Sequence, residues 1–327
     1  MDVKDDLEPL SDAVKTSWHR FLDVFEPLRP DLYRYCRYLT RSPWDAEDLV
    51  QDALARSFVT LGTVFRDLPN PRAWVFRMAS NLWIDRVRRA ARETTLVEPV
   101  AAPLGVESRI VREAAGTLLS QLSPQERAAV VLKDVFDFSL DEIAEVLSTS
   151  TGAIKAALHR GRGRLAAPEE RSGRTPTPEA LDAFCDAFNA RDMNRMTAFL
   201  LDAATVEIVG VVTEYGPNAP ADPKTGSFAG SLVPITFDER GGVRPELLEG
   251  YHGAIARCEV RQHRGEPILL LWYGHDDGPR VRTVWTVETD GDRIVRIRNY
   301  FFTPDVIAEI CGELGVPFRV NGYRYWP

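Results

Sequence analysis

Acidic and amide side chains gather on one face of a helix that the sequence predicts from residue 43. Ser42 is a typical N-cap, and Pro43 is a typical first helical residue. Apolar or small residues recur at positions 46, 49, 50, 53, 54, 57, 58 and 61, which is the spacing of a buried helical stripe. The opposite face carries Asp45, Glu47, Asp48, Gln51 and Asp52. The number of acidic and polar side chains on this face exceeds what interaction with the helix dipole favours. The face therefore indicates either an arginine-rich partner or an ordinary solvated surface.

A second predicted helix carries mainly basic side chains. Asn70 and Pro71 begin it as N-cap and first residue. One of its faces repeats at spacings of four, four, three and four residues and holds Arg77, Asn81, Asp85, Arg88 and Arg92. Arginine binds phosphate, and asparagine and exposed aromatic rings contact unpaired bases. The alternative is a basic outer face on a helix whose two tryptophans, Trp74 and Trp83, lie in the core.

Residues 123–165 have the pattern of a helix-turn-helix motif. Two successive capping boxes, Ser123 with Glu126 and Ser139 with Glu142, each predict the start of a short helix. Ser150 then follows a short turn and begins a third helix, which has small residues in its first turn and a basic outer face. Small residues allow a helix end to approach the floor of the DNA major groove. We interpret this motif as directed to DNA, with a three-helix protein-binding domain as the alternative.

Charge and linker signals divide the chain into blocks. The 327 residues include 40 basic and 48 acidic side chains, for a net charge of −8. Within this acidic background, residues 67–92 and 148–174 each hold six basic and two acidic side chains, or +4. Stretches rich in proline and glycine at 94–105 and 166–179 are typical of linkers. The expected organisation is domains at 1–92, 118–166 and 177–327, with linkers at 93–117 and 167–176.

Composition excludes several classes of protein. No apolar run approaches the roughly 20 residues of a membrane-spanning helix, and the acidic N-terminus lacks the apolar segment of a signal peptide. The cysteines Cys36, Cys185, Cys258 and Cys311 are far apart in the sequence and have no zinc-site spacing. We therefore expect a reduced cytoplasmic protein without a structural disulfide, metal or cofactor.

The third block has the element order of an α+β domain. An amphipathic helix and a short second helix precede five runs with strand character. These runs are 204–210, 259–263, 267–274, 281–289 and 293–301. Helices followed by a meander of antiparallel strands favour the α+β class.

The same block contains few signs of catalysis. Its candidate acid–base residues are His252, His263, Asp202 and Glu207, and none of their spacings predicts a shared site. We therefore expect that the protein is not an enzyme. Trp272, Tyr273 and Trp285 fit either a ligand pocket or a core, and core packing is the more common use of such residues.

Three motifs of the first two blocks resemble a known family. They are DAEDLVQDA (45–53), RAWVFRMASNLWIDRVRR (72–89) and LSPQERAAVVLKDVFDFSLDEIAEVLSTSTGAIKAALHRGRGRL (122–165). In this order, with a linker between them, they resemble regions 2 and 4 of extracytoplasmic-function (ECF) sigma factors, over about residues 18–166. The resemblance implies two all-α domains, a region 2 helical bundle and a region 4 helix-turn-helix, that direct core RNA polymerase to promoters.

The resemblance also implies partners and contact residues. The implied partners are promoter DNA and bacterial core RNA polymerase, through its beta-prime clamp helices and beta flap. The implied polymerase-binding residues are Asp45, Glu47, Asp48, Leu49, Gln51 and Asp52. The implied minus-10 contacts are Arg66, Asn70, Trp74, Arg77, Asn81, Arg88 and Arg89. The implied minus-35 contacts are Ser150, Thr151, Ala153, Lys155, Ala156, His159, Arg160 and Arg162.

The third block resembles SnoaL-like domains of the nuclear transport factor 2-like fold, a cone formed by a curved sheet and helices. The resemblance rests on the first helix, DAFNARDMNRM (186–196), ATVEIVG (204–210) and the closing strands. It implies a fused domain that contacts the sigma blocks and regulates them. The aromatic residues of the tail, Tyr323, Tyr325 and Trp326, need a surface and are expected to pack on the cone or on those blocks. Two other functions stay open: a ligand-responsive regulator that binds DNA without polymerase, and a SnoaL-like enzyme with a DNA-binding appendage.

Overall fold

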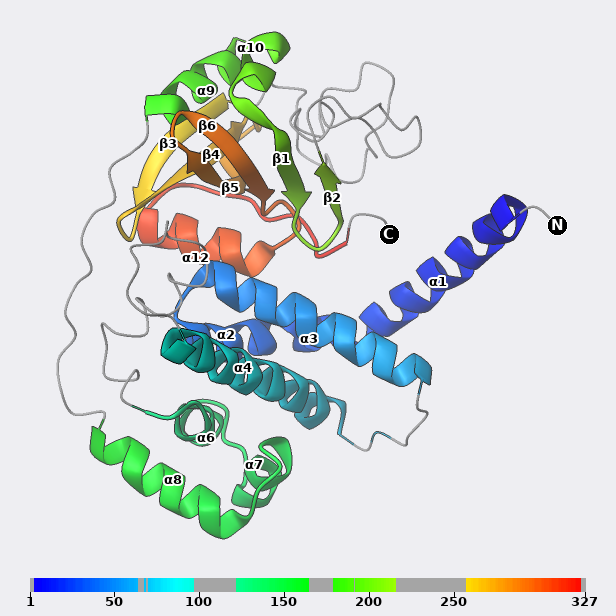
Figure 1. The fold of residues 1–327 in the computed structure, drawn as a ribbon, viewed down its shortest axis with the longest axis vertical. Coiled ribbons are helices and arrows are strands. Elements are labelled where there is room, and N and C mark those ends of the chain that lie inside the picture. Colours follow the sequence, from blue (N-terminus) through cyan, green and yellow to red (C-terminus); the bar gives the residue numbers. More distant parts are fainter. Residues whose placement is uncertain are drawn as a thin grey trace. The chain divides into compact units, whose positions relative to one another are not determined.

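The computed structural model in Figure 1 describes residues 3–63, 68, 70–96, 122–164, 179–190, 192–215 and 257–324. The chain forms two compact units, Met1–Arg171 and Ser172–Pro327. The first unit is helical, and the second combines helices with one sheet. None of the helices in the described part of the chain has the length and apolar character that a membrane span requires.

The N-terminal unit begins with a helical bundle. Its elements are α1 (Val3–Phe25), a short 3₁₀ turn (Glu26–Leu28), α2 (Arg29–Thr40), α3 (Pro43–Thr63) and α4 (Pro71–Leu96). Helices α2, α3 and α4 pack against one another around fully buried apolar side chains that include Leu39, Val50 and Phe76. Their starts follow local signals, because Ser42 Oγ accepts from the amide of Asp45 at 3.2 Å. Both predicted helix starts are confirmed, since Asn70 caps α4 in the same way.

Between residues 122 and 164 the N-terminal unit has the helices α6 (Pro124–Asp134), α7 (Leu140–Val146) and α8 (Thr151–Arg164). Both predicted capping boxes are present, one at Ser123 and one at Ser139. Ser150 Oγ accepts from the amide of Ala153 at 3.2 Å and so caps α8. Ile154 and Leu158 of α8 are buried. The helix-turn-helix prediction is therefore confirmed, and so are the first two positions of the predicted inward stripe at 154, 158, 161 and 165. Burial at the other two positions lies outside the described part of the chain.

The described residues of the C-terminal unit form a six-stranded sheet and three helices. The helices are α9 (Glu179–Asn189), α10 (Met193–Ala198) and α12 (Pro304–Leu314). The strands are β1 (Leu200–Ile208), β2 (Val212–Tyr215), β3 (Arg257–His263), β4 (Glu266–Tyr273), β5 (Arg280–Asp290) and β6 (Arg293–Asn299). Their order is β2-β1-β6-β5-β4-β3, and α9 and α10 lie on the side of the sheet opposite α12 (Figure 1). The predicted α+β class is confirmed.

The sheet departs from the predicted antiparallel meander at one position. Strands β3 to β6 pair antiparallel with their sequence neighbours, but β1 pairs parallel with β6. Strand β2, which the sequence did not indicate, pairs antiparallel with β1. Alternating apolar residues identify a strand but not its partner, so this distant pairing was not predictable from periodicity.

Two of the three aromatic residues considered for a pocket or a core lie in the core, whereas the third, Trp272, is half-buried. Tyr273 and Trp285 are both 2% exposed or less and belong to a cluster between α9 and the sheet. Tyr323 donates a hydrogen bond to Asp305 Oδ2 of α12 at 2.7 Å, so the tail packs on its own unit at this residue. Tyr325 and Trp326 lie outside the described residues.

Candidate nucleic-acid interface

The acidic face of α3 is only partly exposed. Asp45, Asp48 and Gln51 are half-buried, and Asp52 is exposed. The Asp52 carboxylate forms an ion pair with Arg86 of α4. Three carboxylates therefore remain within reach of a partner on this face.

Two of the predicted polymerase-binding residues point inward. Glu47 is completely buried, where it pairs with the buried guanidinium of Arg29 and accepts a hydrogen bond from Gln51 Nε2 at 2.6 Å. Leu49 is also completely buried. The placement of Glu47 on the exposed face was wrong, because α2 packs against α3 and supplies a cation to Glu47. The burial of Leu49 agrees with its position in the predicted apolar stripe.

Helix α4 exposes several of the predicted minus-10 residues. Asn81, Arg88 and Arg89 are exposed, and their spacing places them along one side of the helix. Asn70 is exposed, but its Oδ1 accepts from the amide of Ala73 at 2.9 Å as the helix cap. A nucleic-acid contact by Asn70 would therefore use its side-chain amide nitrogen.

The tryptophans of α4 differ in environment. Trp74 is half-buried, with its ring centroid 5.8 Å from that of Phe25. Trp83 is 5% exposed, and the guanidinium carbon of Arg127 lies 5.7 Å from the centroid of its ring. The interpretation as a core residue is thus correct for Trp83. Arg66 lies outside the described residues.

The outer face of α8 is the most open surface of the predicted interface. Its exposed residues are Ser150, Ala153, Lys155, Ala156, His159 and Arg160, and Thr151 is half-buried. The small side chains are in the first turn, and the basic ones follow. The side chain of Arg162 lies outside the described residues.

Arg160 also holds α8 to α6. Its Nε donates to Glu126 Oε1 at 2.5 Å, and Glu126 is the acidic member of the first capping box. Burial alone would raise the pKa of Glu126, but hydrogen bonds from Arg160 and from Ser123 outweigh it and hold that pKa below its usual value. One guanidinium of the recognition surface is therefore part of the fold of the helix-turn-helix.

A contact between α4 and α7 involves another predicted DNA-binding residue. Arg77 donates from Nε and from Nη2 to the backbone carbonyl of Glu145, at 3.0 and 2.6 Å. Its Nη2 also lies 3.2 Å from the Glu145 carboxylate. The same guanidinium thus joins the bundle to the helix-turn-helix, a long-range contact that the sequence did not signal.

Aromatic packing extends this contact. Phe136 and Phe138, from the turn between α6 and α7, pack on Tyr35 and Phe76 of the bundle with centroids 5.4 to 5.9 Å apart. Arg127 of α6 is buried there and donates to the carbonyl of Leu39 at 2.7 Å. Burial lowers the pKa of Arg127 to about 10, assisted by the nearby charge of Arg41. The two predicted DNA-binding blocks are therefore packed together in one unit.

The candidate acid–base residues of the C-terminal unit do not share a site. Glu207 of β1 accepts hydrogen bonds from Arg296 and Arg298 of β6, at 2.7 and 2.9 Å. His263 of β3 lies 2.8 Å from a carboxylate oxygen of Glu313 in α12. Strands β1 and β3 are separated by three strands, so Glu207 and His263 lie far apart. Asp202 and His252 lie outside the part for which side chains are described.

A helical bundle with a basic helix, joined to a helix-turn-helix with an exposed basic recognition helix, defines a DNA-binding transcription protein. The family models Sigma-70 region 2 and Sigma-70, region 4 match residues 24–93 and 112–165. The ECF RNA polymerase sigma factor SigM of Mycobacterium tuberculosis is 32% identical over 168 residues, covering 50% of this chain and 84% of the relative. The chain belongs to the ECF sigma factors and acts in transcription initiation.

A second relative extends the similarity beyond the sigma regions. The ECF RNA polymerase sigma factor SigJ of Mycobacterium tuberculosis is 29% identical over 290 residues, covering 76% of this chain and 89% of the relative. Since the N-terminal unit ends at Arg171, a match of this length continues into the C-terminal unit. The comparison does not favour a regulator that acts without polymerase.

Two solved structures were also found to be similar to parts of this chain. The crystal structure of the Mycobacterium tuberculosis sigma factor SigJ has 21% identity and a TM-score of 0.31, covering 85% of this chain and 95% of that one. A protein with a ketosteroid isomerase-like fold from Catenulispora acidiphila, in complex with trimethylamine, has 14% identity and a TM-score of 0.25. It covers 43% of this chain and 96% of that one.

Proposed function

We propose that this sigma factor binds core RNA polymerase through the accessible carboxylates of α3 and contacts promoter DNA through α4 and α8. The observation that carries this proposal is the exposed face of α8, where small residues of the first turn precede Lys155 and His159. Small residues permit close approach to base edges, and the basic residues that follow reach phosphates. On α4, the side with Asn81, Arg88 and Arg89 supports contact with the minus-10 element.

The polymerase contact is assigned to Asp45, Asp48 and Asp52, together with Gln51. Their carboxylates suit a basic surface such as the one that the family resemblance implies on the beta-prime clamp helices. Contact of region 4 with the beta flap is the second element of this proposal. Glu47 acts in it as a positioning residue, because its ion pair with Arg29 holds α3 against α2, and Leu49 is fully buried in the bundle.

Co-elution with purified core RNA polymerase tests the polymerase contact. Wild-type protein should elute with core enzyme, and the double variant Asp45→Arg, Asp48→Arg should lose this association. Asp12→Arg is the matched control, because Asp12 is an exposed acid on α1 outside the proposed face. A double variant that binds as well as wild type would contradict the assignment of the face. A wild-type chain that never associates with core enzyme would contradict the polymerase contact itself.

The arrangement of the N-terminal unit supports a second element of the mechanism. Arg77 bonds to Glu145, and Phe136 and Phe138 pack on the bundle. We propose that α4 and the helix-turn-helix separate before Arg77 contacts DNA through the Nε–Nη2 edge of its guanidinium, because the Glu145 carbonyl occupies that edge in the packed unit. Docking on polymerase would supply the required free energy and hold the two blocks at promoter spacing.

The C-terminal unit is proposed to regulate the sigma regions within the same chain. It has its own sheet and buried core, so its removal leaves the core of the N-terminal unit intact. Transcription from a cognate promoter with purified core polymerase should therefore differ between the full chain and a chain ending near residue 175. Equal activity over a range of protein concentrations would contradict regulation by this unit. A non-enzymatic role of the unit stays a prediction.

A further inference from the structure

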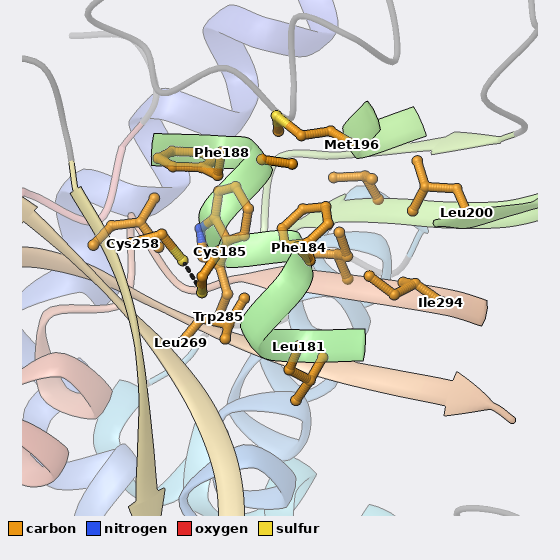
Figure 2. Close-up of a cluster of buried hydrophobic side chains, with 14 of the residues drawn as sticks. Leu181, Phe184, Cys185, Phe188, Met196, Leu200, Cys258, Leu269, Trp285 and Ile294 are labelled. Atoms are coloured by element: carbon orange, nitrogen blue, oxygen red, sulfur yellow. Dashed lines mark hydrogen bonds between the residues drawn. The ribbon is translucent and has the colours of Figure 1, made fainter. Parts of the chain in front are cut away.

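Two cysteines of the C-terminal unit face each other across its core. Cys185 Sγ of α9 and Cys258 Sγ of β3 lie 2.8 Å apart, although the residues are 73 positions apart in the sequence. Figure 2 shows the pair between the helix and the strand, within the cluster that contains Trp285 and Leu269. Both side chains are buried, at 5% and 3% exposure, and both are free thiols.

A second contact fixes the same helix to the same residue of the strand. The Asn189 side chain accepts from the Cys258 amide at 2.7 Å and donates to the Cys258 carbonyl at 2.9 Å. Asn189 lies four positions after Cys185, so both residues point from one face of α9 toward β3. These two hydrogen bonds fix the position of α9 along β3 and its distance from that strand. The two sulfurs are therefore held in place by a contact that does not involve sulfur.

We propose that Cys185 and Cys258 form a redox modification site, at which a reversible disulfide joins α9 to the edge strand β3. A disulfide has an S–S length of about 2.04 Å, so the sulfurs need to approach by less than ~1 Å from their separation of 2.8 Å. The inference goes beyond sigma activity and is independent of it, because it rests on the geometry of the C-terminal unit alone.

The oxidant class is a peroxide, and the reaction balances in two steps. A thiolate of the pair attacks one peroxide oxygen, the O–O bond breaks, and water leaves after proton uptake, which converts the sulfur to a sulfenic acid. The second thiol attacks this sulfur, forms the S–S bond and expels a second water. Two thiols lose two electrons and two protons in total, and hydrogen peroxide is reduced to two waters. Thiol reductants reverse the modification by thiol–disulfide exchange.

Burial makes this site slow to react in the closed fold. Desolvation, assisted by the adjacent Cys185, raises the pKa of the Cys258 thiol well above its usual value, so it is protonated at neutral pH. Desolvation also raises the pKa of Cys311, to about 12. Proximity to a second thiol, rather than acidity, distinguishes the pair, so we expect oxidation to accompany partial opening of α9 from β3.

Peptide mapping of the oxidised full chain tests the site. The protein is treated with hydrogen peroxide, its remaining thiols are alkylated, and the digest is analysed by mass spectrometry without reduction. We expect a cross-linked peptide pair that contains Cys185 and Cys258, lacks two hydrogen atoms and disappears with dithiothreitol. Cys185→Ser and Cys258→Ala should each abolish it. Cys36→Ser and Cys311→Ser are matched controls, because they remove other buried thiols and should leave the cross-link intact.

Hydrogen exchange checks that the link forms in the folded unit. Backbone amides of α9 should exchange at least about fivefold more slowly in the oxidised protein, because the disulfide removes the opening of the helix from the strand. The proposal is overturned if peroxide oxidises methionines while the Cys185–Cys258 peptide is absent. It is also overturned if the link appears only in urea or only between chains, or if α9 exchange is unchanged in the linked protein.

Discussion

The Arg77 guanidinium of α4 donates two hydrogen bonds to the backbone carbonyl of Glu145 at the end of α7, at 3.0 and 2.6 Å. The carbonyl, rather than the exposed carboxylate, is therefore the main acceptor in this contact between the bundle and the helix-turn-helix. A backbone acceptor is present whatever side chain stands at position 145. Replacing Glu145 therefore leaves the carbonyl acceptor in place, whereas replacing Arg77 removes its donors.

Glu145→Ala should change stability much less than Arg77→Ala. The Glu145 carboxylate is 66% exposed and its ion pair is expected to contribute less than about 1 kcal/mol to the free energy of unfolding. Arg77→Ala removes both bonds to the carbonyl and should lower this free energy by about 1–3 kcal/mol. Urea unfolding of the two variants measures the difference. Equal losses would show that the carboxylate dominates the contact.

Phe136 is expected to contribute most to the packing of the helix-turn-helix on the bundle. Its ring is 6% exposed and packs edge-on against Tyr35 and Phe76. Phe136→Ala should lower the free energy of unfolding by about 3–5 kcal/mol, because it leaves a cavity in a shared core. The adjacent Val135, which is 41% exposed, is the control, and Val135→Ala should cost less than about 1 kcal/mol. A small effect of Phe136→Ala would contradict tight packing of the two blocks.

The helix starts of the N-terminal unit were predictable because their signals are local. Each capping side chain, such as Ser42 or Ser139, bonds to an amide three residues further along the chain. The inward stripe of α8 was predictable for a similar reason, since helical spacing alone identifies Ile154 and Leu158.

The errors concern contacts between residues that are distant in the sequence. Glu47 was placed on the exposed face because its partner, Arg29, is 18 positions earlier on a different helix. Arg77 and Glu145 are 68 positions apart, and no periodicity of α4 or α7 indicates their contact. The proximity of Cys185 to Cys258 is of the same kind. A pattern within one element shows which face is buried, but it does not show which residue covers that face.

Because Glu47 is buried and Asp48 is half-buried, we expect Glu47 to stabilise the fold and Asp48 to contact polymerase. Glu47→Ala leaves the Arg29 cation buried without its carboxylate and should lower the free energy of unfolding by about 3–5 kcal/mol. Asp48→Ala, at a half-buried position on the same helix, should change stability by less than about 1 kcal/mol and weaken binding to core polymerase. Chemical unfolding and polymerase titration of both variants measure the two effects. Weak binding by a fully stable Glu47→Ala protein would instead make Glu47 a contact residue.

Lys155 should contribute to DNA binding through phosphate contact. It is exposed on the face of α8 next to His159. Lys155→Ala in the holoenzyme should weaken promoter binding at all sequences alike and reduce the slope of log affinity against log salt by about 1. Lys15→Ala removes an exposed lysine from α1 and should leave the slope unchanged. An unchanged slope for Lys155→Ala would remove this lysine from the interface.

The hydrogen bond between Arg160 and Glu126 predicts how the stability of the helix-turn-helix depends on pH. The folded protein holds the pKa of Glu126 below the ordinary value of 4.5, which it regains on unfolding. The resulting stabilisation is fully present above about pH 4.5 and is lost as the pH falls through the lower pKa of the folded state. Arg160→Ala should therefore destabilise the protein at neutral pH. Below about pH 5 the variant should lose less stability than wild type as the pH falls, because less of its stability depends on the charged form of Glu126. Thermal unfolding of wild type and variant at a series of pH values measures this, with Arg89→Ala as the control for loss of an exposed arginine. Parallel pH profiles for Arg160→Ala and wild type would show that Arg160 does not stabilise the charged form of Glu126.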